Sequence, residues 1–185
     1  MRREKLKLYT AVELKNLEGI MKNPGEKMST RLAISVLENI ELYLPELSQI
    51  MFSNKRPYNW RSAWVIGMIG RLSPENLDNW FTKNSDAIHQ IREEKVITSI
   101  LSLLAIVKLP IDQLSGFYDF ASKQAVLFGA DNKGYYALKF MLRVAKVYPE
   151  LMDEVKLVAA EISERTEKPY LLKYTKGIIK SGRSD

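Results

Sequence analysis

The chain contains a single histidine, which is the first residue to consider for chemistry because imidazole is a common general base near neutral pH. His89 lies in the segment DAIHQIREEK, four residues before Glu93. On one helix this spacing places both side chains on the same face, where the carboxylate could orient the imidazole as a base. The same spacing also fits a surface pair near a helix start, worth about 0.2–0.5 kcal/mol. We favour the surface pair; the enzymatic hypothesis predicts that His89→Ala abolishes activity.

Other motifs that carry chemistry are absent from the sequence. It has no GxGxxG, no Walker-type GxxxxGK[ST], no GxSxG and no HExxH. The lack of cysteine excludes disulfides, cysteine-ligated zinc, iron–sulfur clusters and a thiol nucleophile. The run Asp131-Asn132-Lys133-Gly134 is too short for a calcium loop and is predicted to cap the following helix. We therefore expect no cofactor and no metal, and a non-enzymatic protein.

Two tryptophans four residues apart allow two interpretations. Trp60 and Trp64 share one helix face, which suits either stacking against nucleobases or packing in the core. We favour core packing, together with Trp80 and Phe81.

Composition bounds the class of protein. The chain has 185 residues, 28 Lys and Arg against 22 Asp and Glu, and a net charge of +6, a weak indication of acidic partners. The basic N-terminus lacks the apolar core of a secretory signal, and the most apolar run, 96–107, is too short to span a membrane. We therefore expect a cytoplasmic protein with no membrane partner.

Four prolines in similar contexts indicate that the helices which would position these side chains form a repeat. PEL at Pro45, PENL at Pro74, PIDQL at Pro110 and PEL at Pro149 each follow an apolar helical run. Proline suits the first turn of a helix, where its missing N–H has no partner. Spacings of 29, 36 and 39 residues are typical of helix–turn–helix units stacked in an α-solenoid.

The pattern predicts an all-α fold, a right-handed α–α superhelix of about 9–10 helices in one domain, residues 1–185. The capping box of Thr10 and Glu13 opens a first helix of about 10–21. The proline-led A helices are predicted at 45–52, 74–83, 110–128 and 149–165, and the B helices at 28–43, 59–72, 87–108, 133–148 and 168–181. Residues from about 181 to 185 are predicted to fray.

The B helix at 59–72 is apolar almost all round, which predicts burial between neighbouring helices. Gly67 and Gly70 each cost about 1 kcal/mol inside a helix, so we expect them at close helix–helix approaches.

This helix also carries a family resemblance. The run WRSAWVIGMIGRL, followed by Ser-Pro-Glu, resembles the second helix of a HEAT-like repeat. Trp60-Arg61 stands at the usual Val-Arg, and Gly70-Arg71-Leu72 matches Gly-x-Leu one residue late. The layout resembles small bacterial HEAT-like (armadillo-type) proteins, which implies a solenoid. It is also similar, more distantly, to HEAT-like alkylpurine DNA glycosylases, whose functional residues have no counterparts in this chain.

Near the C-terminus, basic residues are concentrated in the predicted B helices and acidic residues in the predicted A helix between them. Residues 133–148 and 168–183 hold cations and no acid, whereas 149–165 holds five acids against Lys156 and Arg165. Because B helices line the concave face of most helical solenoids, we predict a basic groove there. Its predicted residues are Lys139, Arg143, Lys146, Lys173, Lys176 and Lys180, with Arg61 and Lys95 from earlier B helices.

Two functions remain open for this groove. The first is binding of an acidic protein partner by a non-enzymatic interaction module. The alternative is nucleic-acid binding through phosphate contacts, related to DNA repair only by analogy with the glycosylases. A structural interpretation also exists, because lysines in the last turn of a helix complement the helix dipole.

Overall fold

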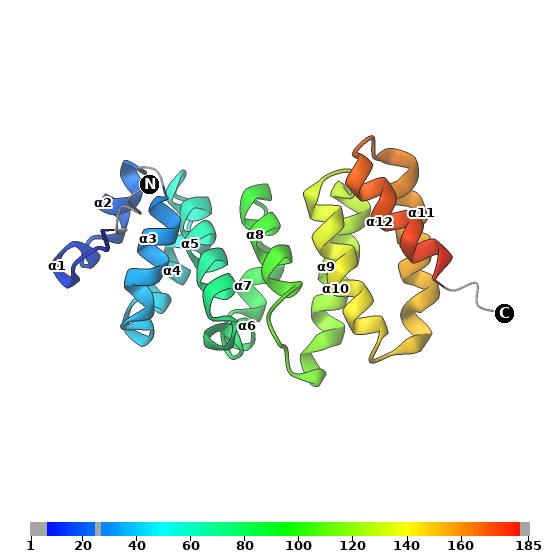
Figure 1. Ribbon diagram of the computed structural model, residues 1–185. Coiled ribbons are helices and arrows are strands. Elements are labelled where there is room, and N and C mark those ends of the chain that lie inside the picture. The colour runs from blue at the N-terminus through cyan, green and yellow to red at the C-terminus, as the bar shows by residue number, and fades with distance from the viewer. Residues whose placement is uncertain (1–6, 25–26, 182–185) are drawn as a thin grey trace, which may run out of the picture. The chain divides into compact units, whose positions relative to one another are not determined.

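The computed structural model describes residues 7–24 and 27–181, and all the regular secondary structure of these residues is helical (Figure 1). These residues form twelve α-helices and three short 3-10 helices, and none of them lies in a β-strand. The predicted all-α class is confirmed.

Contacts divide the chain into two compact units, residues 1–100 and 101–185. We call them the first unit and the second unit. The boundary falls within helix α8, Glu94–Leu104.

The first unit is built around helix α5, Tyr58–Leu72, which packs against α3, Met28–Leu37, and α4, Ile40–Phe52. The shorter elements are α1 (Ala11–Leu14), α2 (Leu17–Lys22), η1 (Pro74–Leu77), α6 (Trp80–Lys83) and α7 (Ser85–Gln90). Large side chains that are fully buried between these helices include Leu32, Leu47, Ile66 and Phe81.

The predicted first helix of 10–21 is two short helices. The capping box is confirmed: the Glu13 N–H donates to Thr10 Oγ1 at 3.3 Å and the Thr10 N–H donates to Glu13 Oε2 at 2.8 Å. However, α1 ends at Leu14, and Asn16 caps α2 by accepting from the Gly19 N–H at 2.8 Å. An asparagine that bonds nearby backbone groups favours a new helix start over continuation.

Pro45 does not open a helix as predicted. It lies inside α4, which begins at Ile40 after a break at Asn39. Proline inside a helix costs about 3 kcal/mol. Burial of Tyr43, Leu47 and Met51 from the same helix offsets that cost. Pro74 and Pro149, in contrast, do begin helical turns, η1 and η3.

The predicted helix of 87–108 is also divided. Helix α7 ends at Gln90 and α8 begins at Glu94, with Ile91 in an extended conformation between them (φ −60°, ψ 137°). His89 and Glu93 therefore do not share a helix, so the common helix face assumed both for the favoured surface pair and for the oriented base is absent.

Helix α5 has the predicted bounds but a different exposure. Trp64 is 46% exposed, so its assignment to the core is wrong, whereas Trp80 is 5% exposed. The Trp80 Nε1–H donates to Ser48 Oγ at 2.8 Å. A Cβ added at Gly67 would meet no atom within 4 Å, so the close approach predicted at this glycine is also wrong.

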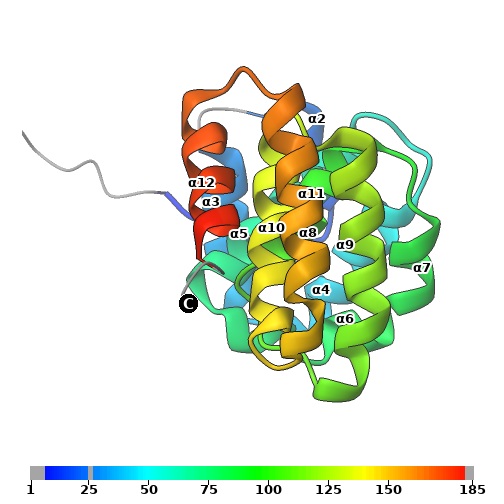
Figure 2. The same cartoon turned by 90° about the vertical axis from the view of Figure 1, so that its right-hand side faces the viewer.

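The second unit has two layers of helices (Figures 1 and 2). One layer contains α10, Asn132–Ala145, and α12, Pro169–Lys180; the other contains α9, Leu114–Phe128, and α11, Met152–Arg165. Short 3-10 helices, η2 (Ile111–Gln113) and η3 (Pro149–Leu151), precede α9 and α11. Its buried core includes Phe117, Phe140 and Ile162.

The turn into α10 contains the cap predicted from sequence. Asp131 stands at the N-cap, and its Oδ1 accepts from the Lys133 N–H at 2.7 Å. Gly134 lies so close to the preceding turn that an added Cβ would clash with the Gly129 carbonyl. Glycine is therefore required at this position by close backbone approach.

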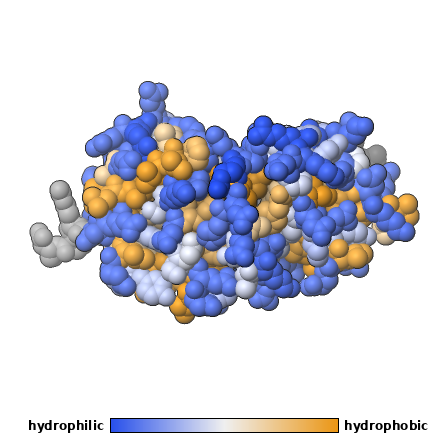
Figure 3. All heavy atoms as spheres, turned by 180° about the vertical axis from the view of Figure 1, so that it is seen from behind, coloured by the Kyte–Doolittle hydropathy of each residue, from blue (hydrophilic) through white to orange (hydrophobic). Residues whose placement is uncertain are grey.

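Apolar side chains also reach the surface. Figure 3 shows apolar patches among polar side chains on the face opposite to that of Figure 1. In the second unit, Val126 and Leu127 on α9 and Leu157 on α11 are exposed. Among the helices formed by residues 7–24 and 27–181, none has the length and apolar character needed to cross a bilayer.

Candidate interaction surface

Helices α10 and α12 lie side by side and run in the same direction (Figure 1). Tyr135 near the start of α10 contacts Tyr170 and Tyr174 near the start of α12. Further along, Leu142 shares a hollow with Ile178. Side chains spaced by three and four residues along each helix therefore form two adjacent stripes.

The six cations predicted for the groove in this unit all belong to these helices or their last turns. Five are exposed: Lys139, Lys146, Lys173, Lys176 and Lys180. No acidic residue occurs in 133–148 or 168–181. None of the six forms an ion pair with any residue that the structure describes. We call these six cations the basic face.

Arg143 differs from the lysines of the basic face because it is half-buried. Its Cζ lies 5.2 Å from the centroid of the Phe140 ring, and its Nη2 is buried without a hydrogen-bond partner. Burial lowers the pKa of the Arg143 guanidinium from its ordinary value, although an arginine stays charged at neutral pH. Arg143 therefore contributes to the fold as well as to the surface charge.

A hollow of about 560 Å³ opens beside the lysines. Its lining comes from α10 and α12 and ends at the residue after α12: Tyr135, Leu142, Tyr170, Lys173, Tyr174, Gly177, Ile178 and Ser181. Tyr135 is central, with its ring centroid 4.8 Å from that of Tyr174 and 6.2 Å from that of Tyr170. We call this the tyrosine hollow.

Two hydroxyl groups of the tyrosine hollow are affected by neighbouring residues, one through a hydrogen bond and one through burial. The Tyr170 hydroxyl donates to Asn132 Oδ1, and Tyr170 remains 46% exposed. Burial, with a smaller contribution from Tyr135, raises the pKa of Tyr174 to about 12. Tyr174 is therefore protonated at neutral pH and presents a neutral ring to the hollow.

Four exposed acidic side chains of the second unit lie on the other layer. Asp153, Glu154, Glu161 and Glu164 of α11 are exposed. Lys133, which begins the basic run in the sequence, is buried and pairs with Asp131 at 3.1 Å. The predicted segregation of charge between the two kinds of helix is therefore present in the second unit.

Arg61 and Lys95 belong to the first unit, where local partners hold them. The Arg61 Nη1 donates to the backbone carbonyls of Met21 and, at 3.0 Å, Lys22, at the end of α2. The Lys95 Nζ lies 4.1 Å from the centroid of the Trp60 ring, within the range of a cation–π contact. Arg61 thus caps a neighbouring helix, a role that its position in the repeat motif did not predict.

The residues considered for catalysis have other contacts. The His89 Nδ1 donates to the Ser85 carbonyl at 2.8 Å, and Arg56 forms an ion pair with Glu93. Residues 7–24 and 27–181 contain no group of three or more His, Cys, Asp or Glu side chains arranged to hold a metal ion.

Sequence reasoning missed the tyrosines of the hollow. Their signal was present: Tyr170 and Tyr174 are four residues apart, and Tyr135 precedes Lys139 by four, so the rings share the helix faces of the lysines. Comparisons with protein-family models, curated proteins and solved structures find no match to this chain.

Proposed function

We propose that the second unit is a non-enzymatic interaction module whose basic face and tyrosine hollow together bind an acidic protein segment with an apolar anchor side chain. The unpaired charge of the basic face is the observation that carries this proposal. The five exposed lysines form no ion pair with the described residues, so they repel one another and an acidic partner would relieve that repulsion.

The tyrosine hollow supports a protein partner in particular. Aromatic side chains in a partly apolar hollow are typical anchor points of protein interfaces, where one buried partner side chain supplies much of the binding energy. Leu142, Ile178 and the open space over Gly177 suit an aliphatic or aromatic side chain. Lys173, which lines the same hollow, would contact a carboxylate beside that anchor.

The proposed scaffold is a HEAT-like solenoid in which successive helix pairs stack. The two-layer packing of α9 to α12 is consistent with two such pairs. In a solenoid the inner layer is the common binding surface, and in the second unit we assign α10 and α12 to that layer.

Nucleic-acid binding is the second candidate, favoured by the combination of lysines and stackable tyrosines. The ring contacts argue against it: Tyr135 packs against Tyr136, Tyr170 and Tyr174. These rings meet edge to face or tilted, so they do not offer a row of parallel faces on which successive bases could stack, whereas one apolar side chain needs only the hollow.

The test is fluorescence anisotropy with a labelled peptide that has acidic residues on both sides of one phenylalanine. We expect wild-type protein to bind this peptide, and to bind the same peptide with serine in place of phenylalanine more weakly. The double variant Lys139→Glu, Lys173→Glu should lose roughly tenfold or more in affinity, since it replaces attraction by repulsion. Lys108→Glu, Lys123→Glu is the matched control, because both lysines are exposed in the second unit outside the basic face and the net charge changes equally.

A labelled single-stranded oligonucleotide separates the two candidates. The proposal predicts that it binds more weakly than the peptide at a salt concentration of about 50 mM, where phosphate contacts are strongest. Tighter binding of the oligonucleotide, lost in the basic-face variant but not in the control, would favour the nucleic-acid function instead.

A further inference from the structure

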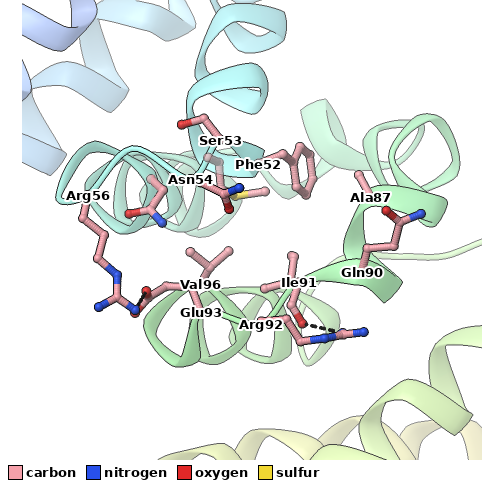
Figure 4. A pocket seen from close by; sticks show the side chains of 12 residues that line it. Phe52, Ser53, Asn54, Arg56, Ala87, Gln90, Ile91, Arg92, Glu93 and Val96 are labelled. Atoms are coloured by element: carbon pink, nitrogen blue, oxygen red, sulfur yellow. Dashed lines mark hydrogen bonds and ion pairs between the residues drawn. The ribbon is translucent and has the colours of Figure 1, made fainter.

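A second hollow, of about 460 Å³, lies in the first unit (Figure 4). The end of α4 and the loop that follows it form one wall, and residues 87–96, where α7 gives way to α8, form the other. The break at Ile91 creates this second wall, because a continuous helix would leave no turn there. The volume is in the range of about 300–1,000 Å³ found for small-molecule sites.

The hollow has an apolar centre with polar groups around it. Phe52 and Ile91 lie on opposite sides in Figure 4, and Val96 points toward the same space. Asn54 and Gln90 contribute amide groups to the lining. Most of the lining residues are polar or charged, so the hollow suits a small polar ligand with one apolar group, which the polar groups would orient.

Asn59 gives the hollow a donor that the protein does not use. This residue lines the hollow and is 4% exposed. Its Oδ1 accepts from the Trp60 N–H at 2.8 Å, which fixes the amide orientation because a backbone N–H can only donate. The Nδ2 makes no hydrogen bond with the described residues. The Nδ2 is not among the buried atoms that lack a partner, so it is accessible from the hollow and can donate a hydrogen bond to a ligand that enters it.

The charges at the hollow do not cancel. Arg56 and Glu93 form an ion pair at one end, as Figure 4 shows. Arg92 lies at the other end, where its Nη1 donates to the Ile91 carbonyl at 3.1 Å. Arg92 has no acidic partner among the residues of the structure, so the lining has one positive charge left over.

From these contacts we propose that the hollow binds a small organic monoanion with three features: an apolar body, one carboxylate and one carbonyl acceptor. The body lies between Phe52 and Ile91, the carboxylate accepts hydrogen bonds from Arg92, and the carbonyl accepts from the Asn59 amide. An N-acylated apolar amino acid has all three features in a molecule of suitable size.

The probe is N-acetyl-L-phenylalanine, titrated into ¹⁵N-labelled full-length protein and followed by NMR. We expect saturable shifts in the lining residues and in the Asn59 side-chain NH₂ resonance. N-acetyl-L-phenylalaninamide has the same shape without the charge and should bind at least about tenfold more weakly. The compound 3-phenylpropionate keeps the carboxylate but lacks the acetamide carbonyl, so it should leave the Asn59 NH₂ resonance unchanged.

Arg92→Gln tests the charge assignment without disturbing the core, since Arg92 is exposed. This variant should bind the acid about as weakly as wild-type protein binds the amide, and should bind the amide unchanged. Arg71→Gln, at the exposed end of α5, is the control and should bind both compounds as wild type does. Equal wild-type affinities for acid and amide, shifts outside the lining, or no saturable shift at millimolar acid would each overturn the proposal.

Discussion

The cations around α5 and those along α10 and α12 are the same residue types in different roles. In the first unit, Lys55 pairs with Glu18 at 3.2 Å, Arg61 caps α2, and Lys95 lies over Trp60. In the second unit, the exposed lysines of the basic face have no acidic partner within residues 7–24 and 27–181. A cation therefore stabilises the fold where the structure supplies a local partner, and is available to a ligand where it does not.

This comparison predicts two kinds of mutational effect. Substitution of a partnered side chain should lower the free energy of unfolding, whereas substitution of an exposed lysine of the basic face should change binding and leave stability nearly unchanged.

The two tryptophans of the first unit should give the largest difference. Trp80→Ala should lower the free energy of unfolding by about 3–5 kcal/mol, since the ring is buried and hydrogen-bonded to Ser48. Trp64→Ala should cost far less, because nearly half of Trp64 is exposed. Urea unfolding measures both, and equal losses would contradict the assigned burial.

Arg61→Ala should lower the free energy of unfolding by about 1–3 kcal/mol, because it leaves the carbonyls at the end of α2 without their donor. Lys176→Ala, on the exposed side of α12, should stay within about 0.5 kcal/mol of wild type. A comparable loss from both variants in urea unfolding would remove the distinction between partnered and unpartnered cations.

Two glycines, one in each unit, allow the same comparison of the two units through the space available for a new Cβ. Gly67→Ala should raise the free energy of unfolding by up to about 1 kcal/mol, since a Cβ meets open space there and alanine favours a helix. Gly134→Ala should lower it, because the added Cβ would clash with the Gly129 carbonyl. Thermal unfolding of both variants measures whether each substitution raises or lowers stability. A destabilised Gly67→Ala protein would show that close packing exists at α5.

Substitution of Tyr174 should have a smaller effect on the free energy of unfolding, visible only at high pH. Its folded-state pKa is raised from 10 to about 12, so the folded protein holds this proton more tightly than the unfolded chain does. The associated stability is complete below the unfolded pKa and is lost as the pH rises through about 12. Tyr174→Phe should therefore lose stability less steeply between about pH 10 and 12 than wild type. Identical slopes would show that the hollow does not bury this hydroxyl.

Much of the helical layout follows from the sequence, because apolar periodicity and proline set it. Helix α5 and the helices of the second unit start and end near their predicted bounds. The breaks at Asn39 and at Ile91 lack a proline or glycine signal, and they depend on tertiary packing. The single repeat domain and its superhelix stay predictions.

The candidate site was predictable in part. Lysine spacing on a helix is visible in the sequence, whereas the burial of Arg143 depends on how α10 packs, with its guanidinium over Phe140. The tyrosine hollow requires two helices to lie in parallel, and the unused Asn59 donor requires the turn at Ile91. Neither arrangement is a property of a single segment, so spacing within one helix could not reveal it.

The most direct test of the central claim fills the tyrosine hollow. Gly177 and Gly116 are both exposed helical glycines with open space around a new Cβ, but only Gly177 lines the hollow. Binding of the phenylalanine-anchored acidic peptide is measured for Gly177→Phe and for Gly116→Phe on α9. The account predicts at least about a tenfold loss of affinity for Gly177→Phe and none for Gly116→Phe. Equal affinities of the two folded variants would contradict the claim that α10 and α12 form the binding surface.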